Sequence, residues 1–502
     1  MGTLSPAVLL RAALAALASL FVFVCMNGGV SAHGWLGVLQ VGAVCGIVAG
    51  AIAPNAPAAV GAGLVAAFLG GFAFLPWFLG GDVLQAAAMA GVAVVVALGV
   101  RLLLERTRVT SMALALVGLV LVVGGLWWVT FPALTQSANG RDMPTLLDTL
   151  RTRPVVGEQW SDGTLFRAVV IEMREGAPYY EAFRRGFLDN GFTRHAPTNV
   201  MQVRLPTLFY LWAMLPDWPA SLVWSLLALA SVACVASVGI AREVVDPTLG
   251  LAGAAAIGAY TMASAQSPNN VASFELWGGL IAVVVLFAYL RSLGSAHHRT
   301  WALVAAVVAV SAFSIRELMI FLPLAGLIAA WFAPAEERRF DLAVWAVALG
   351  SCIALWAAHV MAASRITLSV SGGVASTWLG GGGVEYMLRG LTYNKLFMSA
   401  PWVPFALAAL GVIGALAQRT PQARAFAAFA VVAPVVGFLF VGNAAISRDL
   451  VLGQTVNYWG AIVMPMLIAL APASFAFLPT LRLAPHAAAP AVQRLTEPAA
   501  SL

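Results

Sequence analysis

Charge is scarce in this sequence. Only 10% of its 502 residues are Asp, Glu, Lys or Arg, whereas 61% are hydrophobic. Soluble domains carry roughly 25% charged residues, which is enough to cover their surface. A chain with so little charge cannot keep its surface in water, so lipid must be the solvent for most of it. The composition therefore excludes a soluble globular protein.

Two further absences exclude other classes. The four cysteines all lie in apolar runs, and none belongs to a Cys-x-x-Cys motif, so we expect neither disulfides nor a zinc site. The six His residues are scattered and form no ligand cluster that would support a divalent metal. The sequence therefore assigns no cofactor with certainty. The net charge of +6 comes from basic residues in short loops between apolar runs, which orient membrane proteins. We therefore expect no nucleic-acid partner.

Long apolar runs dominate the chain. A membrane span needs about 20 apolar residues. About fourteen runs (12–14) come close to this length, and they lie near 8–27, 34–54, 57–76, 83–104, 111–131, 219–241, 248–267, 274–291, 300–315, 318–334, 341–362, 401–418, 423–443 and 458–479. The runs 300–315 and 318–334 are short and adjoin at Arg316, so they could form one broken pair. We predict an all-α polytopic membrane protein.

Basic residues predict its orientation. If the N-terminus is cytoplasmic, nearly every short cytoplasmic loop is basic, as the positive-inside rule requires. Those loops carry Arg106, Arg108, Arg242, Arg291, Arg299, Arg338, Arg339, Arg419 and Arg424. Both termini then lie inside, and residues 132–205 and 363–400 lie outside. The Arg-rich, Ala-rich composition favours a bacterial inner membrane.

The chain divides into four parts at changes in composition. Residues 1–110 hold four additional N-terminal spans, and 111–335 form a core that contains the external loop 132–205. Residues 336–480 hold the C-terminal spans with the external loop 363–400, and 481–502 form a Pro/Ala-rich tail that we expect to be disordered in the cytoplasm. Loop 132–205 holds nine Arg and eight Asp or Glu. A loop this long is uncommon unless it has a function.

Amphipathic helices are predicted within that loop. Apolar residues recur at helical spacing from Leu165 to Met173, Gly176 would end this helix, and a second amphipathic piece follows from Tyr179. We expect both helices to lie along the membrane surface. Asp162 stands at the start of the first helix, where its carboxylate could cap the helix, act as a general base, or do both. A short aromatic segment after Arg204 is interfacial or re-entrant.

At these residues the sequence resembles the GT-C superfamily of membrane glycosyltransferases, above all the lipid A aminoarabinose transferases and protein O-mannosyltransferases. The resemblance covers about 111–335. It rests on Asp162, Phe166, Glu172-Met173, Gly176, Tyr179-Tyr180, the Arg204-Leu-Pro segment and Arg316-Glu317, the last with Arg where relatives carry Lys. Gly163 departs from the pattern, because many relatives have Glu there. This puts a paired-carboxylate or metal role in doubt.

The resemblance implies transfer of a sugar from a polyprenyl-phosphate donor, within a lipid membrane, to an acceptor outside the cytoplasm. Asp162 would be the general base, with Glu172 as a second catalytic carboxylate. Arginine suits a phosphate leaving group because its charge is permanent and its donors are planar. The implied phosphate ligands are Arg316, Arg204, Lys395 and Arg448, and the implied substrate-binding residues are Tyr179, Tyr180 and Glu317. Sugar and acceptor are not implied.

Three other functions stay open at this point. An O-antigen polymerase or ligase is also polytopic with a large external loop, but that loop usually comes late in the chain. A lipid or solute transporter would carry charges at the span midplanes and a pseudo-symmetric architecture. A non-catalytic membrane subunit would tolerate loss of Asp162.

Overall fold

The computed structural model describes residues 34–65, 83–107, 110–135, 162–189, 203–216, 218–265, 271–367, 402–418, 420–436 and 462–470, with isolated positions between 12 and 22 and at 200. Helices make up nearly all of this described part, which contains no strand. The predicted all-α class is therefore confirmed for these residues. Within the predicted runs 8–27, 57–76 and 458–479, several residues lie outside the described part.

Six described helices are long and apolar enough to cross a membrane, so the chain is a membrane protein; the predicted total of about fourteen spans stays a prediction. They are α4 (Val83–Arg106), α5 (Ser111–Thr135), α10 (Trp218–Val244), α13 (Phe274–Leu293), α14 (His298–Ile315) and α16 (Ala335–Ala363). Shorter apolar helices are α2 (Gly34–Ile52), α11 (Gly250–Ala265), α15 (Phe321–Ala330), α19 (Trp402–Gln418) and α20 (Pro421–Pro434).

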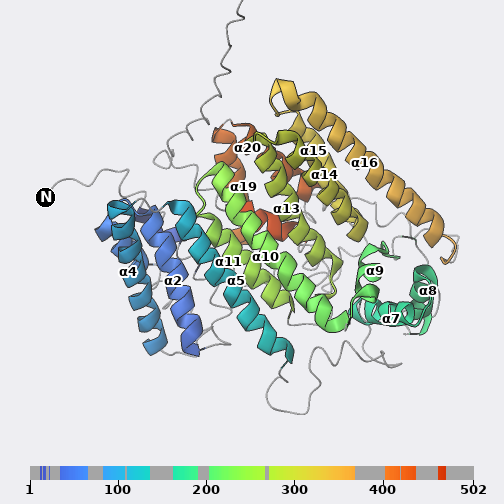
Figure 1. Ribbon diagram of the computed structural model, residues 1–502, viewed down its shortest axis with the longest axis horizontal. Coiled ribbons are helices and arrows are strands. Elements are labelled where there is room, and N and C mark those ends of the chain that lie inside the picture. The colour runs from blue at the N-terminus through green and yellow to red at the C-terminus, as the bar shows by residue number, and fades with distance from the viewer. Residues whose placement is uncertain are drawn as a thin grey trace, which may run out of the picture.

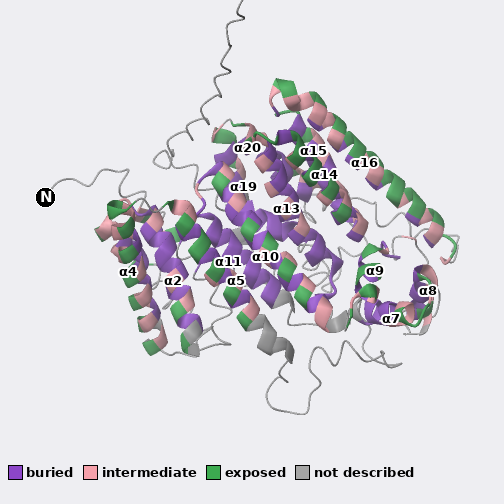
Figure 2. Ribbon diagram, in the orientation of Figure 1, coloured by how far each residue is buried: buried purple, intermediate pink, exposed green. Residues whose placement is uncertain are grey.

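Helix α13 forms the centre of the bundle. It contacts α10 and α14 along their lengths and also α20, and it is the most buried of the six long helices. Helices α4 and α16 are the least buried and lie at the periphery, where Figure 2 shows many exposed positions along them. Their exposed side chains are apolar, as with Val95 and Val347, which suits contact with lipid.

Helices α2 and α4 pack at unusually short range. Gly42, Gly46 and Gly50 repeat every four residues on α2, as in the small-xxx-small pattern of membrane helix pairs. A Cβ atom on Gly46 would lie 2.7 Å from the backbone oxygen of Ala93, and one on Gly50 would clash with that of Ala97. Only glycine allows the two backbones to approach this closely.

Three short helices form a cap at one end of the bundle. They are α7 (Asp162–Arg174), α8 (Tyr179–Asp189) and α9 (Thr207–Met214), and Figure 1 shows them grouped beside the C-terminal end of α16. Gly176, with a φ of +101°, ends α7 as predicted, because its left-handed conformation turns the chain into α8. The rings of Phe166, Phe209 and Phe274 dock this cap onto α13, with centroids 4.9–5.4 Å apart.

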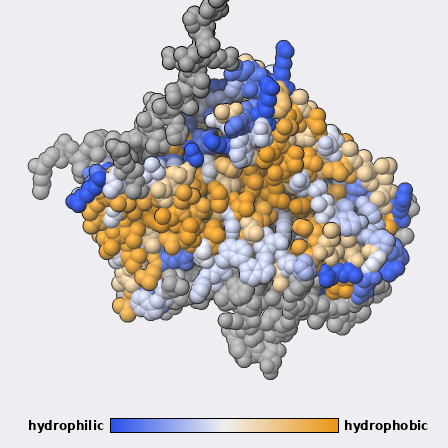
Figure 3. Space-filling model, viewed as in Figure 1, coloured by the Kyte–Doolittle hydropathy of each residue, from blue (hydrophilic) through white to orange (hydrophobic). Residues whose placement is uncertain are grey.

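The bundle has two polar ends separated by an apolar band, which is visible in Figure 3. At one end Arg291 pairs with Glu243 at 3.1 Å, and Arg299 pairs with Glu337 at 3.2 Å. These pairs join the predicted cytoplasmic ends of α10, α13, α14 and α16. The cap of α7, α8 and α9 lies at the opposite end of α16. The ends of α10, α13, α14 and α16 that carry these two pairs therefore lie together, and the side of the membrane that they face stays a prediction.

Candidate functional site

The candidate site begins where α14 ends. Arg316 follows α14 in an extended conformation (φ −141°, ψ 119°), and a 3-10 helix, η3 (Glu317–Ile320), starts directly after it. The junction predicted between the runs 300–315 and 318–334 is thus a break between two helices. The guanidinium of Arg316 turns into the bundle and is only 1% exposed. A charge in this position requires partners.

Two carboxylates supply those partners. Arg316 Nε lies 2.8 Å from Glu275 Oε1, an ion pair whose N–H is not aligned for a hydrogen bond, and Arg316 Nη1 donates to Glu317 Oε1 at 2.5 Å. Glu275 stands in the first turn of α13 and is fully buried, and Ser273 donates to its other oxygen at 3.1 Å. The N-terminal helix dipole also favours a carboxylate there. The pair therefore ties α13 to the α14–η3 junction.

Arg204 adds a second cation from the cap side. Its Nη1 lies 3.9 Å from Glu317 Oε1, and its side chain is 10% exposed, so it is nearer the surface than Arg316. We call Arg204, Glu275, Arg316 and Glu317 the four-residue ion network. Its formal charges cancel. One oxygen, Glu317 Oε2, is buried without a hydrogen-bond partner among the atoms that the structure describes.

Two tyrosines border the ion network. The Tyr179 hydroxyl donates to the backbone oxygen of Arg204, and the Tyr180 hydroxyl contacts His359 Nδ1 at 3.1 Å. Burial, then Tyr180 and Glu317, raise the pKa of Tyr179 well above its usual value, with Arg204 opposing. Burial, then Tyr210, raises the pKa of Tyr180. Both phenols are therefore protonated at neutral pH.

His359 links α16 to this site. Its Nε2 contacts the backbone oxygen of Val203 at 3.0 Å, directly before Arg204. Both ring nitrogens of His359 therefore lie within hydrogen-bonding distance of a partner. Among the described residues, no group of three or more His, Cys, Asp or Glu side chains could hold a metal ion.

Several predicted site residues come together here, and others do not. Three of them, Arg204, Arg316 and Glu317, belong to the ion network, and Tyr179 and Tyr180 border it.

Glu172 lies on α7 with its carboxylate 3.6 Å from Arg185 Nη1, outside that network. Asp162 is the first residue of α7, and its side chain lies outside the described part, as do Lys395 and Arg448 entirely. Their predicted roles remain predictions.

Sequence reasoning missed Glu275. It is the one carboxylate in the predicted span 274–291, and a lone charge inside an apolar run usually marks a functional or paired group. That signal was available.

A second network was also missed: at the basic end, His298 Nε2 lies 2.7 Å from Asp341 Oδ1, and Tyr289 donates to Asp341 Oδ2 at 3.0 Å. This network joins α13, α14 and α16 without facing the cap.

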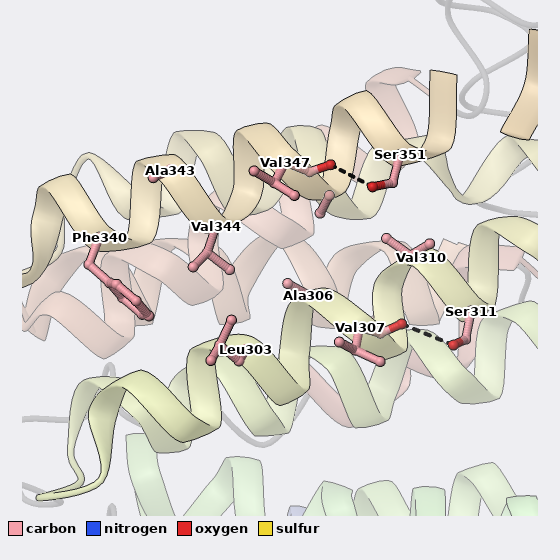
Figure 4. Close-up of a pocket in the computed structure, with 11 residues that line it drawn as sticks. Leu303, Ala306, Val307, Val310, Ser311, Phe340, Ala343, Val344, Val347 and Ser351 are labelled. Carbon is pink, nitrogen blue, oxygen red and sulfur yellow. Dashed lines mark hydrogen bonds between the residues drawn. The ribbon is translucent and has the colours of Figure 1, made fainter. Parts of the chain in front are cut away.

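An apolar groove runs between α14 and α16. It is lined by Leu303, Ala306, Val307, Val310, Ser311, Phe340, Ala343, Val344, Val347, Ala348 and Ser351. As Figure 4 shows, its two hydroxyls are engaged within their own helices: Ser311 donates to Val307 at 3.0 Å and Ser351 to Val347 at 2.9 Å. The groove therefore offers a hydrocarbon surface and no polar group for chemistry.

Fold and site together define an all-α membrane protein with a buried ion network beneath a helical cap. In comparisons with known proteins, no family model, no curated protein and no solved structure matches this chain.

Proposed function

We propose that this protein is an integral-membrane glycosyltransferase of the bacterial inner membrane. It transfers a sugar from a polyprenyl-phosphate donor to an acceptor hydroxyl on the extracytoplasmic face. The proposal rests on the resemblance to the GT-C superfamily and on one structural observation. This observation is that the ion network joins the cap to the end of α14 opposite Arg299. Tyr179 of α8 donates to the backbone oxygen of Arg204, and Arg316 directly follows α14.

The cost of such a network supports a functional role. A charged side chain at membrane depth costs on the order of 2.5–3.5 kcal/mol, and a buried ion pair seldom stabilises a fold more than apolar residues of the same shape would. Four such charges are therefore poorly explained by stability alone. Because Arg204 is the more exposed of the two cations, we assign the donor phosphate to it. Arg316 holds Glu317 in position from below.

The reaction itself needs few groups. Asp162, at the first turn of α7, takes the proton of the acceptor hydroxyl while the acceptor oxygen forms a bond to the anomeric carbon. The bond from that carbon to the phosphate oxygen breaks, and polyprenyl phosphate leaves with the electron pair. A positioned base contributes about 10²–10⁴-fold to such a step. The cation of Arg204 stabilises the charge that develops on the leaving phosphate.

The surroundings suit a lipid donor. The groove on α14 spans Leu303 to Ser311, and the same helix ends one residue before Arg316. A hydrocarbon chain in this groove would lie along the helix that leads to the ion network. The groove's walls are apolar, so the hydrophobic effect favours its occupation by a chain from the bilayer.

Arg204→Met tests the phosphate assignment. The protein would be reconstituted in vesicles with radiolabelled polyprenyl-phosphate sugars, and sugar transfer or release measured. Removing a charge-assisted contact to phosphate should reduce kcat/KM roughly 10- to 100-fold. Arg299→Met, a 67% exposed arginine at the basic end, is the matched control and should retain activity. Equal activity of Arg204→Met and wild type would refute the assignment.

A further inference from the structure

The contact between Tyr180 and His359 links the cap to a peripheral span. Tyr180 belongs to α8, and His359 lies near the C-terminal end of α16, 179 residues further along the chain. His359 is 3% exposed, whereas the Tyr180 side chain is only partly buried. The tyrosine is therefore the member of the pair that a ligand can reach.

The partners of His359 determine where its protons lie. The oxygen of Val203, 3.0 Å from Nε2, is a carbonyl and can only accept, so Nε2 must carry the hydrogen. In a neutral imidazole, Nδ1 then has a lone pair and must accept. Tyr180, 3.1 Å away, is protonated and is the donor to Nδ1.

This arrangement leaves the Tyr180 oxygen with lone pairs alone. Its one hydrogen is committed to His359, so towards any ligand the hydroxyl acts as an acceptor. The neighbouring Tyr179 hydrogen is likewise committed, to the backbone of Arg204. A ligand that reaches the Tyr180 oxygen must therefore bring an O–H or N–H donor.

We propose that His359 holds Tyr180 as a hydrogen-bond acceptor for a hydroxyl of the donor sugar, next to the phosphate bound by Arg204. This deepens the proposed function and rests on it. Phosphate oxygens are acceptors and are repelled by the Tyr180 lone pairs, so the phosphate belongs at the guanidinium. A sugar hydroxyl is a donor and suits Tyr180. The site thus selects a phosphate that carries a polyol over the bare lipid phosphate.

Two probes distinguish binding of the sugar from binding of the phosphate: polyprenyl phosphate and polyprenyl-phosphate hexose. The equilibrium affinity of each would be measured for the purified full chain in lipid nanodiscs. Wild type should prefer the hexose-bearing lipid. Tyr180→Phe removes one oxygen without changing the ring and should reduce that preference roughly 3- to 10-fold, the range for one hydrogen bond. Its affinity for the bare lipid should not change. Tyr289→Phe, the same change at a hydrogen-bonded tyrosine of the basic end, is the matched control and should keep the preference.

Variants at His359 separate positioning from packing. Asn places a carboxamide oxygen near the position of Nδ1, so His359→Asn should keep the preference, whereas His359→Leu should lose it as Tyr180→Phe does. A purely structural histidine would change the unfolding temperature in both variants and leave the ratio of the two affinities unaltered.

An unchanged ratio in Tyr180→Phe would overturn the inference even if His359→Leu did not fold, and so would a wild type without preference for the hexose-bearing lipid. Wild-type preference without any sugar transfer would instead refute the proposed function and leave the Tyr180 assignment standing.

Discussion

Arg316 Nε lies 2.8 Å from Glu275 Oε1, and the two side chains are 1% and 0% exposed. The arginine follows α14 directly, and the glutamate stands in the first turn of α13. The pair therefore fixes the position at which Glu317, the next residue along the chain, reaches towards Arg204. Loss of either partner would leave an uncompensated charge inside the bundle.

Arg316→Met should therefore destabilise the fold. Breaking a buried ion pair from one side costs about 3–5 kcal/mol, because the abandoned carboxylate stays buried. Thermal unfolding in detergent would show a large decrease in unfolding temperature. Arg299→Met removes an arginine that is 67% exposed and paired with Glu337, and it should cost at most about 1 kcal/mol. Equal decreases in unfolding temperature in the two variants would contradict the claim that burial makes the Arg316 pair the more important one.

Gly46→Val should separate α2 from α4. A Cβ at this position lies 2.7 Å from both the backbone oxygen of Ala93 and the Cβ of Val96, so the helices must move apart. Overpacking of this kind typically costs about 1–3 kcal/mol. Gly99→Val on α4 is the control, since no atom lies within 4 Å of a Cβ there. Unfolding temperatures of both variants in detergent would test this, and equal values would speak against the close packing.

Sidedness can be tested with single cysteines. In a chain whose native cysteines are replaced by alanine, Arg185→Cys lies on the cap and Arg299→Cys at the basic end; the native side chains are 50% and 67% exposed. The positive-inside rule predicts that an impermeant maleimide labels position 185 in intact cells and position 299 only after permeabilisation. Labelling with the opposite sidedness would place the ion network on the cytoplasmic face.

Acid should weaken one contact within the cap. Hydrogen bonds from Arg184 and then Arg185 lower the pKa of Glu181 from 4.5 to about 2. A lowered carboxylate pKa stabilises the folded state above pH 4.5, and this contribution is lost as the pH falls towards 2. The unfolding temperatures of wild type and Glu181→Gln should thus differ by a small, constant amount above pH 4.5 and converge below it. A difference that grew on acidification would exclude this linkage.

Much of the fold could be predicted from hydropathy. Spans such as α10, α13 and α14 begin and end within a few residues of the predicted runs. A run of about 20 apolar residues forms a helix in a bilayer because the helix satisfies its own backbone hydrogen bonds. The helices α7 and α8 were also predictable, since Gly176 separates two amphipathic segments. Sequence periodicity could not show that the Phe166 ring would dock on Phe274 of a span more than 100 residues away.

The site was only partly predictable. Arg316 and Glu317 stood out because charge is rare in apolar surroundings, and Arg204 was identified through the resemblance alone. The pairing of Arg316 with Glu275 and the contact of Tyr180 with His359 depend on which helix ends meet, and this is a property of tertiary packing. The hydrogen bonds of His359 could not be predicted either, because its partners Val203 and Tyr180 come from distant parts of the chain.

The measurement that bears most directly on the proposed transferase is sugar transfer by Asp162→Asn. The variant would be reconstituted in vesicles with radiolabelled polyprenyl-phosphate sugar and acceptor-containing membranes, beside wild type and Asp246→Asn, whose aspartate follows α10 at the basic end. If Asp162 is the base, Asp162→Asn should lose about 10²–10⁴-fold in kcat with donor binding intact, while Asp246→Asn keeps its activity. Wild-type rates in a folded Asp162→Asn protein would contradict the account.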